Sequence, residues 1–120
     1  MSAEDGIRRT LASYCQLFDS KKWDELARIF AEDASLTSRR GTFKGREAVI
    51  HDLQHAMTDD YSGTLFTSNS VIEVDGDTAC VVSDFLGVEG KKIVAVGTYK
   101  DTLQRSGSTW RFTGKEIILK

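Results

Sequence analysis

Apolar residues recur at steps of three and four along two segments near the start of the chain, the spacing of one helix face. The first segment spans residues 4–18 and the second spans residues 23–31, with the polar run 19–22 between them. The apolar positions are Ile7, Leu11, Tyr14, Cys15 and Phe18 in the first, and Trp23, Leu26, Ala27 and Phe30 in the second. We therefore expect two amphipathic helices.

The pattern then breaks and resumes. Residues 34–45 are tolerant of β structure and interrupted by Gly41 and Gly45, which favours a small edge hairpin. Residues 46–57 again place apolar side chains on one face: Val49, Leu53, Ala56 and Met57. This predicts a third helix.

The second half of the chain consists of β-rich runs separated by short turn sequences. The runs are residues 65–74, 78–88, 91–105 and 109–119, and the connections at 75–77, 89–90 and 106–108 each contain glycine. Such connections are typical of hairpins, so we expect an antiparallel meander. Three helices packed on one face of this curled sheet would leave a cone whose wide end is a pocket. The predicted fold class is α+β: a cone-shaped barrel with three N-terminal helices on a curved antiparallel sheet, mixed at its edge.

Composition limits the partners. The chain has 120 residues and 40% hydrophobic content, enough for one core and one domain spanning residues 1–120. Its net charge of -2 arises from 16 basic and 18 acidic residues without a basic stripe, so nucleic acid is not an expected partner. It lacks an apolar run of the roughly 18–20 residues that would span a bilayer. It also lacks the pattern of a signal peptide. We expect no membrane partner and a cytoplasmic location.

Cysteine and histidine give no sign of a metal site. Cys15 and Cys80 lack CxxC spacing and are expected to be buried free thiols. His51 and His55 have i, i+4 spacing, which can serve a metal, but they lie opposite the predicted apolar face and should face solvent. Nucleotide and flavin signatures are also missing, so we expect no cofactor.

Seven short strings follow one another in a particular order along nearly the whole chain. They are residues 14–19 (YCQLFD), 23–30 (WDELARIF), 32–34 (EDA), 45–50 (GREAVI), 71–79 (VIEVDGDTA), 97–101 (GTYKD) and 110–112 (WRF). In this order they resemble the SnoaL-like branch of the nuclear transport factor 2-like superfamily. The resemblance implies a cone-shaped α+β barrel, usually dimeric or trimeric, with a deep hydrophobic pocket. Members include polyketide cyclases, steroid isomerases, dehydratases, dehydrochlorinases and pockets with no known chemistry, so the fold alone does not set the function.

Asp19 is the first candidate for chemistry. A carboxylate at the end of a helix is disfavoured by roughly 0.3–1 kcal/mol, and burial in a pocket would raise its pKa toward the range useful for proton transfer. In dehydratase-like and dehydrochlorinase-like relatives, the matching aspartate orients a histidine base that begins a His-x-x-x-Asn string. This chain reads LFTSN at residues 65–69, so Asn69 matches and Leu65 replaces the base. The alternative is that Asp19 caps the second helix or pairs with a neighbouring lysine, Lys21 or Lys22.

Tyr14 and Asp101 are the other two candidates for a catalytic role. Tyr14 resembles the oxyanion-stabilising tyrosine of steroid isomerase-like members. The position that matches their general-base aspartate falls near Ser38 in this chain, where there is no carboxylate. Tyr14 could equally be ordinary core. Strand alternation places Tyr99 and Asp101 on the same face as the small Gly97, where a ligand or helix could approach. The alternative for Asp101 is a cross-strand pair with Lys115 or Arg111.

These observations lead to a hypothesis of a pocket for a small hydrophobic or part-polar molecule, of cyclic, steroid-like or polyketide-like type. The protein would act as a cofactor-independent lyase or isomerase by proton transfer, or else as a non-catalytic binding or dimerisation module. The expected catalytic residues are Asp19, Tyr14 and Asp101, and the expected substrate-binding residues are Trp23, Phe30, Leu65, Asn69, Phe85 and Tyr99. Apolar residues on the opposite sheet face, among them Val82, Leu86, Val94 and Val96, predict a homodimer through the sheet.

Overall fold

The structure is a computed structural model that describes residues 2–56 and 62–120. Its first element, α1 (Ala3–Asp19), begins at Ser2, whose hydroxyl accepts a hydrogen bond of 3.1 Å from the Asp5 amide. The acidic side chains of the first turn also suit the positive end of the helix dipole. The face predicted to be apolar is buried along its length.

The second helix, α2 (Trp23–Arg28), is shorter than the sequence pattern predicted, because Phe30 begins β1 (Phe30–Ser38). The carbonyl of Ile29 accepts a 2.9 Å hydrogen bond from the amide of Phe112, and Phe30 pairs with Phe112 in parallel register. This long-range pairing takes the backbone out of the helix. The prediction of helix through residue 31 was therefore wrong at its end.

The hairpin and the third helix occur where they were predicted. β1 pairs with β2 (Gly41–Lys44), and α3 (Arg46–His55) follows Gly45, whose φ of +93° suits glycine. The Arg46 guanidinium donates two hydrogen bonds, of 2.8 and 3.0 Å, to the carbonyl of Phe30, which joins α3 to β1. Met57, the last residue of the predicted third helix, lies outside the described residues.

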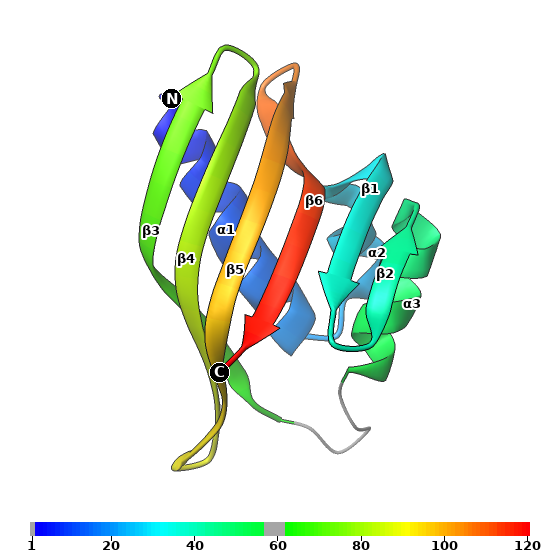
Figure 1. Ribbon diagram of the computed structural model, residues 1–120, viewed down its shortest axis with the longest axis vertical. Helices are drawn as coiled ribbons and strands as arrows, with labels where there is room; N and C mark the ends of the chain where they lie inside the picture. The colour runs from blue at the N-terminus through cyan, green and yellow to red at the C-terminus, as the bar shows by residue number, and fades with distance from the viewer. Residues whose placement is uncertain (1, 57–61) are drawn as a thin grey trace.

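The remaining strands form the predicted meander: β3 (Thr64–Asp75), β4 (Thr78–Glu89), β5 (Lys92–Ser106) and β6 (Thr109–Leu119). The six strands run in the order β2-β1-β6-β5-β4-β3, antiparallel except where β1 pairs with β6. All three helices lie on one side of this curved sheet (Figure 1). The α+β class and the mixed edge are thus confirmed, but β2 and β3 remain as two edges and the sheet does not close into a barrel.

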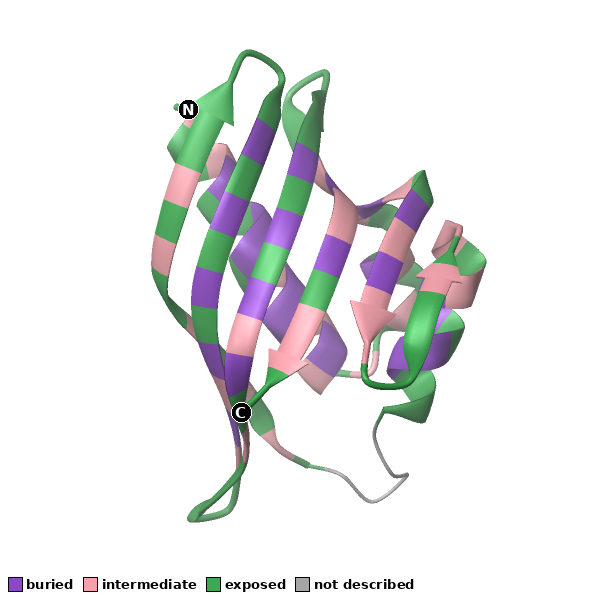
Figure 2. Cartoon of the chain, viewed as in Figure 1, coloured by how far each residue is buried: buried purple, intermediate pink, exposed green. Residues whose placement is uncertain are grey.

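Alternation along β4 and β5 separates a core face from an outer face (Figure 2). Tyr99 and Asp101 are buried on the core face, as their spacing predicted. Cys15 is buried, whereas Cys80 is exposed because it lies between the inward-facing Ala79 and Val81. The prediction of a buried Cys80 was wrong.

The outer face of the sheet carries several exposed apolar side chains: Phe66, Val71, Val82 and Val96. Val94, expected on this face, lies at the register shift between β4 and β5 and lines a cavity on the core side instead. A homodimer through this face stays a prediction. Among the described residues, no helix has the length and apolar character needed to cross a membrane.

Candidate functional site

A cavity of about 420 Å³ lies between α1, the end of α3 and the core face of the sheet, within the range of roughly 300–1,000 Å³ typical of small-molecule sites. We call it the central cavity. Four of the predicted site residues line it: Tyr14 from α1, Leu65 from β3, Phe85 from β4 and Tyr99 from β5. Its other lining residues are Phe18, Ser38, Arg39, Arg40, Leu53, Ala56, Gly87, Val94, Ala95, Ile117 and Leu119.

Phe85 and Tyr99 form one wall of the central cavity. Their rings are stacked in parallel, with centroids 4.0 Å apart and planes 3° apart. Gly97 makes this possible, because a Cβ at that position would lie 2.6 Å from the Phe85 ring. The space beside Gly97, expected to admit a ligand or a helix, is taken by Phe85.

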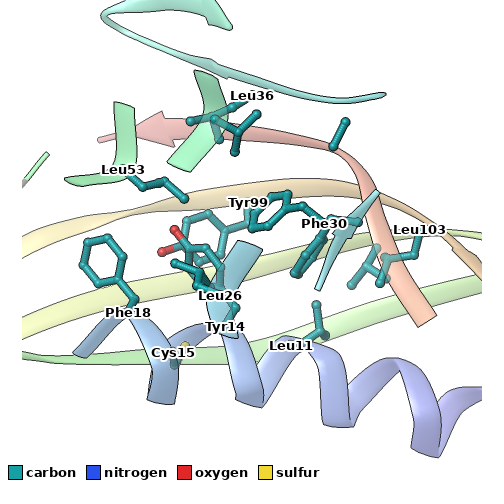
Figure 3. Packing of buried hydrophobic residues seen from close by; sticks show 14 of the residues in the cluster. Leu11, Tyr14, Cys15, Phe18, Leu26, Phe30, Leu36, Leu53, Tyr99 and Leu103 are labelled. Atoms are coloured by element: carbon teal, nitrogen blue, oxygen red, sulfur yellow. The ribbon is translucent and has the colours of Figure 1, made fainter. Parts of the chain in front are cut away.

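The hydroxyl groups of Tyr14 and Tyr99 supply the polar atoms of this wall. Their rings meet edge to face with centroids 5.8 Å apart, and Figure 3 shows the two phenol oxygens beside one another within the apolar cluster. Burial raises the pKa of both tyrosines well above the usual value of 10.0. Both side chains therefore stay neutral at physiological pH and can donate hydrogen bonds.

Asp101 and Lys115 form a buried ion pair behind these tyrosines. Their side chains are 0% and 1% exposed, and Lys115 Nζ lies 3.1 Å from Asp101 Oδ1. Lys115 Nζ also lies 3.7 Å from the ring centroid of Tyr99 and 4.1 Å from that of Tyr14, as in cation–π contacts. Asp101 Oδ2 has no hydrogen-bond partner among the described residues.

The environment of this pair acts against both of its charges. Burial raises the pKa of Asp101, an effect that Lys115 opposes, and burial lowers the pKa of Lys115, an effect that Asp101 opposes. The cross-strand pair with Lys115, one of the two alternatives for Asp101, is thus the one that forms. Asp101 is not among the lining residues of the central cavity.

Asp19 lies on the other side of α1, in a groove of about 330 Å³ between α1 and β3. Its two carboxylate oxygens accept the backbone N–H of Leu65 at 3.0 and 3.2 Å. Burial raises the pKa of Asp19, and the hydrogen bond from Leu65 opposes this. Asp19 therefore contacts the residue that stands in place of the histidine, through its backbone, and the Leu65 side chain lines both the groove and the central cavity.

Three of the predicted binding residues do not line the central cavity. Asn69 lies in a bulge of β3 with a φ of +53°, and its exposed side chain donates to Asp84 at 2.9 Å. Trp23 packs edge-on against Phe18, with ring centroids 5.7 Å apart. Phe30 is fully buried.

The structure adds residues at the cavity that the sequence pattern did not single out. Arg39 and Arg40 come from the β1–β2 turn, and Arg40 donates two hydrogen bonds, of 2.8 and 2.9 Å, to Asp52 of α3. Asp52 is only 4% exposed. The sequence could have indicated a buried role for Asp52, because this residue lies on the predicted apolar face of the helix, between Val49 and Leu53.

The two histidines take no part in this site. His51 and His55 are exposed, as predicted, and His55 Nδ1 lies 2.8 Å from the carbonyl of His51. Within residues 2–56 and 62–120, no group of three or more histidine, cysteine or acidic side chains could hold a metal ion.

Solved structures with the same fold span nearly the whole chain. A protein of unknown function from Mycobacterium tuberculosis is 26% identical, with a TM-score of 0.85 over 95% of this chain and 69% of its own. An NTF2-like protein with a cystatin-like fold from Novosphingobium aromaticivorans is 26% identical, with a TM-score of 0.84 over 97% and 80%. A hexachlorocyclohexane dehydrochlorinase is 20% identical, with a TM-score of 0.83 over 98% and 85%.

No curated protein matches the chain. The family model of the SnoaL-like domain matches residues 1–115, almost the full length, and the similar structures carry the corresponding NTF2-like fold. The chain belongs to the SnoaL-like domain family.

Proposed function

We propose that the central cavity binds a small, largely apolar molecule that carries a carbonyl or hydroxyl oxygen. One observation carries the proposal: the neutral hydroxyls of Tyr14 and Tyr99 lie together in an otherwise mainly apolar lining. Apolar contact with Phe18, Leu53 and Phe85 would hold the body of the ligand, at about 25 cal/mol for each Å² removed from water. A phenol in such a surrounding orients a ligand through its oxygen atom.

The proposal is tested by titrating 1-tetralone, a bicyclic ketone, and tetralin, its hydrocarbon counterpart, into the wild-type protein and into Tyr14→Phe by isothermal calorimetry. We expect both to bind, because both fill the apolar cavity. Loss of one hydrogen bond in Tyr14→Phe should weaken 1-tetralone about fivefold and leave tetralin unchanged.

Thr42→Val, which removes an exposed hydroxyl from β2 outside the central cavity, serves as the matched control. It should bind both compounds as the wild type does. Failure of both compounds to bind at saturable, stoichiometric levels would refute the proposal. An equal loss of both compounds in Tyr14→Phe would instead show a packing role for the tyrosine.

A second candidate function is cofactor-independent proton transfer by a lyase or isomerase, and the environment of Asp19 favours it. This carboxylate has a raised pKa and holds the backbone of Leu65, whose side chain lines the central cavity. A base with a raised pKa is better matched to removing a proton next to a carbonyl group. Neither carboxylate lines the central cavity, but Asp19 opens to the groove that shares Leu65 with it, whereas Asp101 is fully buried in its ion pair with Lys115.

This candidate predicts that the protein accelerates exchange of the C2 protons of 1-tetralone with deuterated water, followed by proton NMR. Asp19→Asn should reduce the exchange rate at least about 100-fold while keeping most of the affinity for 1-tetralone. The wild-type rate should rise with pH as Asp19 loses its proton, at a pH above the usual aspartate pKa of 3.8 because burial raises the pKa of this carboxyl. Exchange that is unaffected by the substitution would eliminate Asp19 as the base and leave the binding proposal standing.

A further inference from the structure

The rim of the central cavity carries positive charge. The β1–β2 turn places Arg39 and Arg40 at the cavity, and these are the only two charged residues in its described lining. The remaining lining is apolar apart from Ser38 and the two tyrosines. A ligand that enters therefore meets an apolar interior with a cationic edge.

Arg40 is held in a fixed position at this edge. Its Nε and Nη2 donate to the two carboxylate oxygens of Asp52, which is buried on α3. This paired geometry restrains the planar guanidinium, and Nη1 has no hydrogen-bond partner among the described residues. Arg40 and Tyr14 both line the central cavity, so the ligand that contacts one can also contact the other.

Arg39 supplies a charge that is not balanced nearby. It is exposed, and within the described part of the chain it has neither a hydrogen-bonded nor an ion-paired partner. Because Asp52 balances Arg40, the described rim carries one uncompensated positive charge. A singly charged anion is the complementary ligand group, and a planar carboxylate matches the two-pronged donor geometry of guanidinium.

We propose that the central cavity is selective for amphipathic carboxylates, with the apolar body against Phe18, Leu53 and Phe85 and the carboxylate at Arg39 and Arg40. This inference rests on the proposed function and narrows its ligand class. Burial of the apolar part of a ligand would not by itself require charged groups in the lining of the cavity. The arginines instead compensate the cost of bringing a carboxylate to the edge of a mainly apolar cavity.

The test compares 2-naphthoate with 2-naphthamide, which has nearly the same shape and no charge, by isothermal calorimetry at neutral pH. The wild type should bind 2-naphthoate about tenfold more tightly, because charge-assisted hydrogen bonds are stronger than neutral ones. Added salt should reduce this preference, since the rim is open to solvent.

Two variants test whether the rim arginines cause the preference for 2-naphthoate over 2-naphthamide. Arg39→Gln removes the uncompensated charge and should lower the preference for 2-naphthoate severalfold. The double variant Arg40→Gln/Asp52→Asn removes the ion pair without changing the net charge and leaves two amides that can hydrogen bond, so Asp52 is not left buried and unpaired. It should also lower the preference, whereas Arg9→Gln, on the exposed side of α1, should not.

The outcomes separate the two proposals. Equal affinity for both probes in the wild type would overturn the carboxylate inference and leave the binding function in place. A preference that persists in both rim variants would also overturn it. Failure of both probes to bind would count against the binding function itself, and the inference would fall with it.

Discussion

Replacing Lys115 with methionine is expected to destabilise the folded protein by about 3–5 kcal/mol, measured by urea unfolding. The substitution keeps much of the side-chain volume but removes the partner of Asp101, which is 0% exposed. The Asp101 carboxylate would then have lost the hydrogen bond to Oδ1, and Oδ2 already has no partner among the described residues. Removing one partner of a buried ion pair lowers the free energy of unfolding by more than the intact pair contributes to it, because an uncompensated charge stays buried.

The double variant Asp101→Leu/Lys115→Met distinguishes this explanation from loss of packing. Removing both charges should restore most of the stability, since an apolar pair of similar size escapes the desolvation penalty. If the double variant were as unstable as Lys115→Met, the cost would lie in packing around the aromatic rings rather than in the unpaired carboxylate. The pair would then be a minor electrostatic feature of this core.

A second large effect is expected at alkaline pH. Burial raises the pKa of Tyr14 and Tyr99 above 10.0, so both keep their protons in the folded state after unfolded tyrosines have lost theirs. Above about pH 10 the unfolded state therefore binds fewer protons than the folded state, and stability falls as pH rises. The expected slope is up to about 1.4 kcal/mol per pH unit for each tyrosine.

Urea unfolding at several pH values on either side of about 10 measures this slope. The double variant Tyr14→Phe/Tyr99→Phe should show a shallower decline, because it has lost both groups. Burial also raises the pKa of Cys15, but that thiol is present in both proteins and its contribution cancels in the comparison. Equal slopes in the two proteins would show that these phenols ionise in the folded state.

The main helices and strands of this fold, and the direction of several side chains, were predictable from local sequence patterns. The apolar stripe of α1, the four long strands and the inward direction of Tyr99 and Asp101 all follow from periodicity. Periodicity is sufficient there because each side chain's direction depends on its neighbours in sequence. The same alternation would have placed Cys80 outward, had it been given more weight than the general tendency of cysteine to be buried.

The candidate site depended more on contacts between distant residues. Asn69 matched the expected string, but it lies at the bulge in β3 and its side chain donates a hydrogen bond to Asp84. Bulges change the direction of side chains without a clear mark in the pattern of hydrophobic positions. The position of Arg40 likewise depends on Asp52, 12 residues later, through a hydrogen-bond pair that spacing does not reveal.

By itself, the sequence determined the order of helices and strands, the α+β class and which face of each long element is apolar, because these depend on the periods of the two backbone conformations. The tertiary structure alone decided three further features: α2 ends early at the parallel pairing with β6, the sheet stays open, and Asp101 is bound to Lys115 rather than placed in the cavity lining. Each of these results from a contact between strands or side chains far apart in sequence. Such contacts form when the sheet assembles, and they decided which of the predicted residues meet at the central cavity.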